Sequence, residues 1–172
     1  MFRPRIIPVL LLKNRILVKS VGFNNYKYIG DPINAVRIFN DSKADELVFL
    51  DITATKENRI IDLDFVKDVG EEANMPFAVG GGIRSIKDIQ AIIGAGAEKV
   101  VINSYAAEQP DFVEQAADTF GSSAITICID VKKKLFKGLR AWIKGGTEAV
   151  PHDPVTFAQL MEAKGAGAII IQ

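Results

Sequence analysis

The chain has 172 residues, of which 48% are hydrophobic and 24% are charged, an ordinary composition for a globular domain. Its 21 basic and 21 acidic residues give a formal net charge of zero, which argues against a general nucleic-acid-binding role because such proteins usually carry a basic excess. One cysteine, Cys128, and one histidine, His152, exclude an internal disulfide and argue against a classical zinc site, so we expect neither a metal nor another cofactor.

The first apolar stretch, residues 6–12, has to be distinguished from a leader and from a membrane segment. Arg3 and Arg5 precede it, as in a weak signal peptide, but Lys13 and Asn14 end it at once and no small-residue cleavage site follows. No apolar run reaches the roughly 18 residues that a membrane helix needs. We therefore interpret the stretch as a buried strand and expect a cytoplasmic protein that does not act on a membrane.

Short apolar runs alternate with longer amphipathic ones along the chain. Runs that are apolar on both faces are typical of buried parallel strands, and they span residues 5–12, 46–52, 75–79, 99–103, 124–130 and 168–171. Capping residues and amphipathic spacing predict helices over residues 31–42, 61–69, 85–94, 110–120 and 153–165. Residues 17–20 and 135–143 are interpreted as hairpin arms. This alternation predicts an α/β fold with a parallel sheet.

Part of the pattern occurs twice. The matching pairs are residues 10–13 with 129–132, Asp31-Pro32 with Asp153-Pro154, and 44–49 with 165–170. Such a repeat is expected of a (β/α)8 TIM barrel built from two half-barrels, which takes about 200–250 residues. We therefore predict one partial barrel domain over residues 1–172 that ends in strand six. The first half-barrel would span 1–120 and the start of the second 121–172; a doubly wound open sheet is the alternative.

Gly80-Gly81-Gly82 follows the third expected strand and precedes a helix that Ser85 would cap. In parallel α/β folds the functional residues follow the carboxyl ends of the strands. Glycines let backbone N–H groups approach an anion closely, and a helix N-terminus favours negative charge. Asn103 and Ser104, after the next strand, add further donors. Together these residues predict a phosphate cradle, with a tight strand–helix turn as the alternative.

Two aspartates follow apolar strands. Asp130 ends one of them and is a candidate general acid or base, with a pair to Lys132 or a loop cap as the alternative. Asp51 is a candidate substrate-binding residue that could instead accept bonds from neighbouring backbone donors. Cys128 is expected in the core and His152 in a surface loop.

Several segments together resemble the cyclase subunit of imidazole glycerol phosphate synthase, a (β/α)8 barrel of histidine biosynthesis, and the resemblance runs the whole chain. They are residues 5–8, 30–32, 45–54, 76–83, 96–103 and 129–132. The resemblance implies a heterodimer with a glutaminase subunit docked at the amino-terminal face of the barrel. Ammonia from that partner would pass through the barrel to a small-molecule substrate with two phosphates, held at the carboxyl-terminal face.

The resemblance also implies roles for particular residues. It places the second catalytic aspartate at Asp130, the first phosphate site at Gly82, Asn103 and Ser104, and an active-site lysine at Lys19. A second phosphate site would lie after strands seven and eight, which residues 1–172 do not include.

A charged ring at the amino-terminal mouth, which gates ammonia in the family, falls on Arg5, Glu46 and Lys99. Its fourth member is usually Glu and falls on Ala168, so two cations face one anion instead of two. The family's first catalytic aspartate falls on Leu11, which cannot transfer a proton. A positioned acid or base is typically worth about 10²–10⁴-fold in rate, so we expect an impaired cyclase step.

These departures leave three functions open. The chain is a cyclase subunit that is impaired or incomplete, or a paralogue that delivers ammonia for sugar amidation in surface-polysaccharide synthesis, or a scaffold that only binds the glutaminase. The segment at residues 10–13 resembles the surface-polysaccharide relatives and favours the second function.

Overall fold

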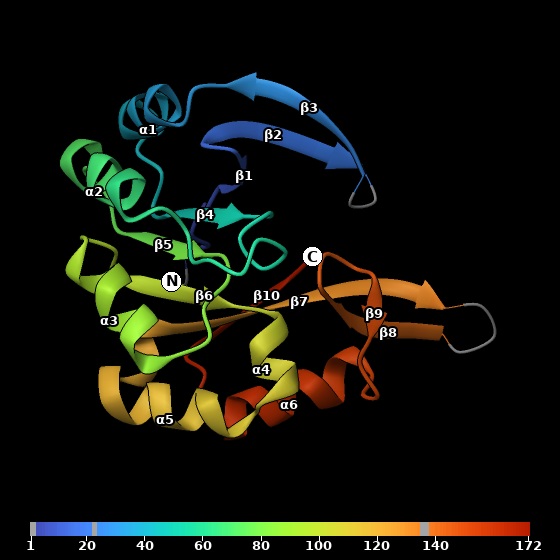
Figure 1. Cartoon of the computed structure of the whole chain (residues 1–172). Coiled ribbons are helices and arrows are strands. Elements are labelled where there is room, and N and C mark those ends of the chain that lie inside the picture. The colour runs from blue at the N-terminus through green and yellow to red at the C-terminus, as the bar shows by residue number, and fades with distance from the viewer. Residues whose placement is uncertain (1–2, 22–23, 135–137) are drawn as a thin grey trace.

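The computed structural model describes residues 3–21, 24–134 and 138–172, and its centre is one ten-stranded sheet (Figure 1). Six neighbouring strands run parallel: β1 (Val9–Lys13), β4 (Leu47–Asp51), β5 (Phe77–Gly80), β6 (Lys99–Ile102), β7 (Ile125–Lys134) and β10 (Ala168–Ile171). The mixed α/β fold with a parallel sheet is therefore confirmed. A barrel that ends in strand six is not confirmed, because four further strands belong to the same sheet.

Those four strands form two antiparallel arms. β2 (Ile16–Val21) and β3 (Asn24–Gly30) continue from β1, and β8 (Gly138–Ile143) and β9 (Glu148–Ala149) continue from β7. Figure 1 shows both arms extending toward the same end of the sheet. The hairpin predicted at residues 17–20 is confirmed as part of β2. Of the arm predicted at residues 135–143, residues 135–137 lie outside the described part of the chain and the rest forms β8.

The first parallel strand begins at Val9, four residues later than predicted. Pro4 and Pro8 have no backbone N–H, so this segment cannot build a regular ladder. It still follows the edge of β4, because the backbone oxygen of Ile6 accepts from the amide of Asp45 at 3.1 Å and that of Pro8 from the amide of Val48 at 2.9 Å.

In the described part of the chain, five helices of nine or ten residues connect the strands, close to the predicted positions. They are α1 (Pro32–Asp41), α2 (Leu63–Glu72), α3 (Ile86–Gly94), α5 (Asp111–Phe120) and α6 (Pro154–Ala163). Asp31 caps α1 and Asp153 caps α6, each followed by proline at the first helical position. The short helix α4 (Ser104–Glu108) is not predicted, because five residues are too few for a periodic signal.

The order strand, antiparallel arm, aspartate-capped helix and parallel strand occurs twice in the structure. It runs from β1 through α1 to β4, and again from β7 through α6 to β10. This repetition matches the one predicted from the sequence, while the half-barrel boundary between residues 120 and 121 stays a prediction.

The two faces of the parallel sheet differ. Side chains alternate between the faces of a strand, and those facing the helices form the main core, which includes the fully buried Phe49, Val79 and Ile127. The other face carries a smaller apolar cluster of Val48, Ala78, Val101 and Cys128. Within the described residues, no helix is both long and apolar enough to cross a membrane.

Candidate functional site

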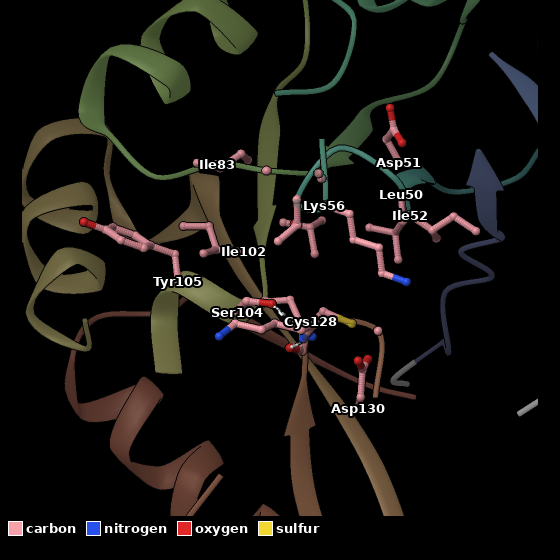
Figure 2. Close-up of a pocket in the computed structure, with 18 of the residues that line it drawn as sticks. Leu50, Asp51, Ile52, Lys56, Ile83, Ile102, Ser104, Tyr105, Cys128 and Asp130 are labelled. Atoms are coloured by element: carbon pink, nitrogen blue, oxygen red, sulfur yellow. Dashed lines mark hydrogen bonds between the residues drawn. The ribbon is translucent and has the colours of Figure 1, made fainter. Parts of the chain in front are cut away.

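A cavity of about 350 Å³ opens at the carboxyl ends of the parallel strands (Figure 2). The ends of β1, β4, β5, β6 and β7 all contribute to its wall, so residues far apart in the sequence meet there. The wall is mainly apolar with a few polar groups, which is the usual character of a small-molecule site. The predicted site residues that line it are Leu11, Asp51, Gly81, Gly82, Asn103, Ser104 and Asp130.

The turn after β5 has room only for glycine. Gly81 and Gly82 have φ angles of +139° and +70°, which other residues rarely adopt. A Cβ atom on Gly82 would lie 1.8 Å from the backbone oxygen of Arg59. This turn, which has no side chains, lines the cavity, and α3 begins after it with Ser85 as its N-cap. Backbone amides followed by a helix N-terminus suit an anion.

Asn103 and Ser104 follow β6 and line the same cavity. Asn103 Nδ2 donates to the backbone oxygen of Cys128 at 3.0 Å, and Ser104 Oγ donates to Asn103 Oδ1 at 3.1 Å. The amide of Lys144 in turn donates to Ser104 Oγ at 3.0 Å. These bonds hold both polar side chains in place beside the glycine turn, as the predicted phosphate cradle requires.

Asp130 lies on β7 with only 4% of its surface exposed. Burial disfavours the carboxylate and raises the pKa of Asp130 to about 6, against the opposing effects of a hydrogen bond from Asn103 and the charge of Lys132. A carboxyl group with this pKa exchanges its proton near neutral pH, which suits a general acid or base. The predicted acid–base residue therefore lies in the cavity wall with a suitable pKa.

Asp51 lies at the edge of the cavity, but its carboxylate is used within its own loop. Asp51 Oδ1 accepts from the amides of Thr53 at 2.9 Å and Ala54 at 3.2 Å, and from Thr53 Oγ1 at 2.9 Å. Asp51 Oδ2 accepts from Arg59 Nη1 at 2.6 Å. The alternative drawn from the sequence, in which Asp51 bonds neighbouring backbone donors, describes this geometry better than substrate binding does.

Leu11 and Lys19 both lie in the β1–β2 region. Leu11 pairs with Leu50 in the parallel register of β1 and β4 and lines the cavity. Lys19 is exposed on β2, opposite Lys27 of β3, and is not among the residues that line the cavity in the described part of the chain. The structure therefore brings Leu11 to the site and leaves Lys19 outside it.

Other ionisable residues of the cavity are not predicted from the sequence. Lys56 comes from the loop after β4, and Arg84 follows the glycine turn. Lys144 and Glu108 form an ion pair of 3.2 Å at another part of the wall. Single lysines in loops belong to no motif. The one usable signal is Arg84, two residues after the last of three glycines.

Arg5, Glu46 and Lys99 meet near the opposite, amino-terminal ends of the parallel strands. Glu46 is 5% exposed, and its Oε2 atom accepts from Lys99 Nζ at 2.7 Å and from Arg5 Nη1 at 3.4 Å. A buried carboxylate with two cationic donors is compensated in charge and in hydrogen bonds. Ala168, at the fourth predicted ring position, begins β10 and adds no charge.

One face of the sheet joins this charged cluster to the cavity. Glu46, Val48 and Leu50 are two residues apart and share that face, as do Lys99 and Asn103 on β6 and its continuation. Four residues of strand span about 13 Å. Between the two ends lies the small apolar cluster of the second face, so a short neutral surface separates the charged cluster from the cavity.

The assembled groups offer an anion-binding turn and, in Asp130, a buried carboxyl group that can act as an acid or a base. The glycine turn with Asn103 and Ser104 suits a phosphate group, Asp130 can move a proton, and Leu11 supplies only apolar surface. Across residues 3–21, 24–134 and 138–172, no three histidine, cysteine or carboxylate side chains gather where they could hold a metal ion.

The sequence is similar to that of known proteins of one family. The family described as histidine biosynthesis protein matches residues 5–172. Imidazole glycerol phosphate synthase subunit HisF of Trichormus variabilis is 39% identical, and that of Alkaliphilus metalliredigens 43% identical. A Pseudomonas aeruginosa protein provisionally named as the same subunit, hisF2, is 40% identical. Each match covers 99% of this chain and 68% of the relative, so the chain spans about two thirds of their length.

Proposed function

The chain belongs to the histidine biosynthesis protein family, and on this basis we propose that it is a cyclase-subunit-like protein of imidazole glycerol phosphate synthase. In this proposal the cavity binds a phosphorylated ribonucleotide, and ammonia from a glutaminase partner reacts there. The single observation that carries the proposal is the position of the buried Asp130 in one cavity with the glycine turn, Asn103 and Ser104.

The phosphate of the substrate would lie on the glycine turn. Gly81 and Gly82 carry no side chain that would keep an anion from the backbone of the turn. The side chains of Asn103 and Ser104 would turn from their present acceptors, the backbone oxygen of Cys128 and Asn103 Oδ1, to donate to the phosphate. Asp130 would then give or take a proton at the reacting centre, for which a pKa of about 6 is well suited.

Ammonia would enter at the cluster of Arg5, Glu46 and Lys99 and move along the face of the sheet that carries the small apolar cluster. The neutral surface between that cluster and the cavity favours an uncharged molecule such as ammonia over the ammonium ion, because desolvating a charge is costly. With alanine at position 168, the cluster has two cations and one anion. We expect this cluster to restrict ammonia less tightly than a ring of four charges would.

Leu11 limits the cyclase step in this proposal. A leucine in the wall of the same cavity as Asp130 offers no proton, and a positioned acid or base contributes about 10²–10⁴-fold in rate. The rate with the histidine-pathway substrate should be low for this reason.

A second candidate function is ammonia delivery for sugar amidation in surface-polysaccharide synthesis. The observation that favours it is Leu11 itself, because the cavity keeps its phosphate-binding features while one proton-transferring position is apolar. A scaffold that binds the glutaminase without any turnover is the third.

Assays with the purified chain separate these functions. Ammonia-dependent formation of imidazole glycerol phosphate, with either an ammonium salt or a glutaminase subunit and glutamine, supports the cyclase. Stimulation of the glutaminase without turnover of the histidine-pathway substrate supports delivery or scaffolding, and a requirement for a third, sugar-binding protein distinguishes delivery. Neither turnover nor glutaminase stimulation would contradict all three.

A further inference from the structure

Asn103 connects the phosphate-binding side of the cavity with the acid–base residue. The nitrogen of its side chain carries two hydrogens. That nitrogen donates to the backbone oxygen of Cys128 at 3.0 Å, and the same amide group stabilises the charged form of Asp130 by a hydrogen bond. Figure 2 shows Cys128 and Asp130 on the side of the cavity that also holds Ser104, the next residue after Asn103. The donors of Asn103 are therefore committed to β7.

Ser104 holds Asn103 in this orientation. Ser104 Oγ donates to Asn103 Oδ1 at 3.1 Å and accepts from the backbone amide of Lys144 at 3.0 Å. The serine oxygen is thus anchored by the turn between β8 and β9, while its hydrogen can be redirected by rotation about the Cβ–Oγ bond. A charged phosphate oxygen is a stronger acceptor than an amide oxygen. The bond that fixes the asparagine is therefore one for which a phosphate would compete.

Two cations share the face of the sheet on which Asp130 lies. Lys132 follows two residues later on β7, and Arg140 lies opposite Lys132 on β8. The ammonium of Lys132 also donates to a backbone oxygen of the β8–β9 turn at 2.6 Å. The thiol of Cys128 stays neutral, because burial raises its pKa to about 12. Of the thiol and the carboxyl, Asp130 with its pKa of about 6 is the group that gains or loses a proton near neutral pH.

The other charged groups of the cavity wall are Asp51, Lys56, Arg84, Glu108 and Lys144. Asp51 pairs with Arg59, and Glu108 pairs with Lys144. Figure 2 shows the amino group of Lys56 directed toward the wall that holds Asp130. A bound phosphate would add about two negative charges to these surroundings. Negative charge near a carboxyl group favours its neutral form.

We propose that a phosphate on the glycine turn draws the Asn103 side chain away from β7 and so leaves Asp130 protonated, with the proton taken from bulk water. The inference rests on the proposed function and deepens it, because binding of the substrate itself loads the acid–base residue. Both hydrogens of the Asn103 amide are on one nitrogen, so its turn toward the phosphate removes the bond that stabilises the charged Asp130. Burial then acts without this opposition, and the phosphate charge acts in the same direction. Asp130 therefore serves first as an acid.

Anion binding and protonation of Asp130 are linked in this arrangement. If the complex holds the proton more tightly than the chain alone, the protonated chain must hold the anion more tightly by the same factor. The affinity for the anion therefore falls as the pH rises above about 6, and complex formation takes up protons from the solvent in that range. A shift of one pKa unit corresponds to about a tenfold change in affinity.

Sulfate is the probe, because it resembles a phosphate dianion in shape and charge but does not itself titrate near neutral pH. Calorimetric titration of the full chain in two buffers of different ionisation enthalpy, at constant ionic strength, measures the protons taken up. For a shift of one pKa unit, we expect an uptake of about 0.5 proton per sulfate at pH 6.5 and about tenfold tighter binding at pH 5 than at pH 8. Asp130→Asn should bind sulfate without proton uptake and with similar affinity at both pH values. Asn103→Ala should bind it more weakly and take up fewer protons.

Asp118→Asn is the matched control, because Asp118 is exposed on α5 and does not line the cavity. It should keep the proton uptake and the pH dependence of the wild-type chain. The inference is overturned if the wild-type chain binds sulfate without taking up protons, or if either Asp130→Asn or Asn103→Ala takes up as many protons as the wild type. If neither sulfate nor ribose 5-phosphate binds, the phosphate site of the proposed function fails as well, and the two failures are therefore distinguishable.

Discussion

The Nδ2 atom of Asn103 donates to the backbone oxygen of Cys128 at 3.0 Å, which joins the end of β6 to β7 two residues before Asp130. The same side chain also stabilises the charged form of Asp130 by a hydrogen bond, while burial disfavours that form more strongly. The protonation of Asp130 therefore depends on how closely these two strand ends pack.

Replacing Asp130 by Asn should stabilise the protein at alkaline pH. The pKa of the carboxyl is about 6 in the folded chain against an ordinary value of 3.8, so the folded state binds more protons than the unfolded state between those values. The free energy of unfolding consequently falls as pH rises from about 4 to about 6. Asp130→Asn should raise it at pH 8 by at most about 3 kcal/mol and change it little at pH 4.

Urea denaturation at both pH values measures this difference. Asp118→Asn, on the exposed side of α5, serves as the control and should show no comparable pH dependence. A stabilisation of Asp130→Asn that is equal at pH 4 and pH 8 would contradict the raised pKa.

Gly82→Ala should destabilise the chain and open the glycine turn. Its Cβ atom would meet the backbone oxygen of Arg59 at 1.8 Å, and the residue has a φ of +70°, so the loop after β4 must shift. We expect a loss of at least about 2 kcal/mol in the free energy of unfolding. Gly94→Ala at the end of α3, where a Cβ meets nothing within 4 Å, should be neutral or slightly stabilising. Similar losses for the two variants would argue against the described turn.

Lys99→Met and Arg5→Met should differ in their effect on stability. Lys99 Nζ lies 2.7 Å from a carboxylate oxygen of the buried Glu46, and the lysine side chain is 22% exposed, whereas Arg5 is 62% exposed at 3.4 Å. Removing Lys99 leaves Glu46 with one weak, solvated partner and should cost about 1–3 kcal/mol. Removing Arg5 should cost less than about 1 kcal/mol. Thermal unfolding of both variants gives the comparison, and an equal or larger loss for Arg5→Met would refute the assigned geometry.

Much of the sheet could be predicted because its strands and caps have local signals. Continuous apolar runs mark the six parallel strands, and aspartate followed by proline marks the first residues of α1 and α6. The predicted start of β1 is wrong. Ile6 and Ile7 continue the apolar run, but the neighbouring prolines interrupt the hydrogen-bonded ladder before Val9. The arms were predicted only in outline, since antiparallel partners depend on turns and register rather than on composition.

The candidate site was only partly predictable. The polar and glycine residues that follow strand ends form recognisable segments: Gly81, Gly82, Asn103 and Ser104. Their meeting in one cavity could therefore be predicted from the sequence. The sequence could not decide whether Asp51 and Lys19 face a substrate. The hydrogen-bond partners of a carboxylate and the exposed face of an antiparallel arm both depend on tertiary structure. Cations in loops, such as Lys56, belong to no sequence pattern. Their place in the cavity wall could not be predicted, because it depends on how the loop folds against the neighbouring strands.

The most direct test of the account is the rate of imidazole glycerol phosphate formation from the histidine-pathway substrate with an ammonium salt, compared between the wild-type chain and Leu11→Asp. Because Asp130 lines one cavity with the glycine turn, Asn103 and Ser104, Leu11→Asp should raise this rate by about 10²-fold or more. Adding Asp130→Asn to Leu11→Asp should abolish the gain. A Leu11→Asp variant that folds normally and shows no increase would contradict the claim that Leu11 limits a cyclase site in this cavity.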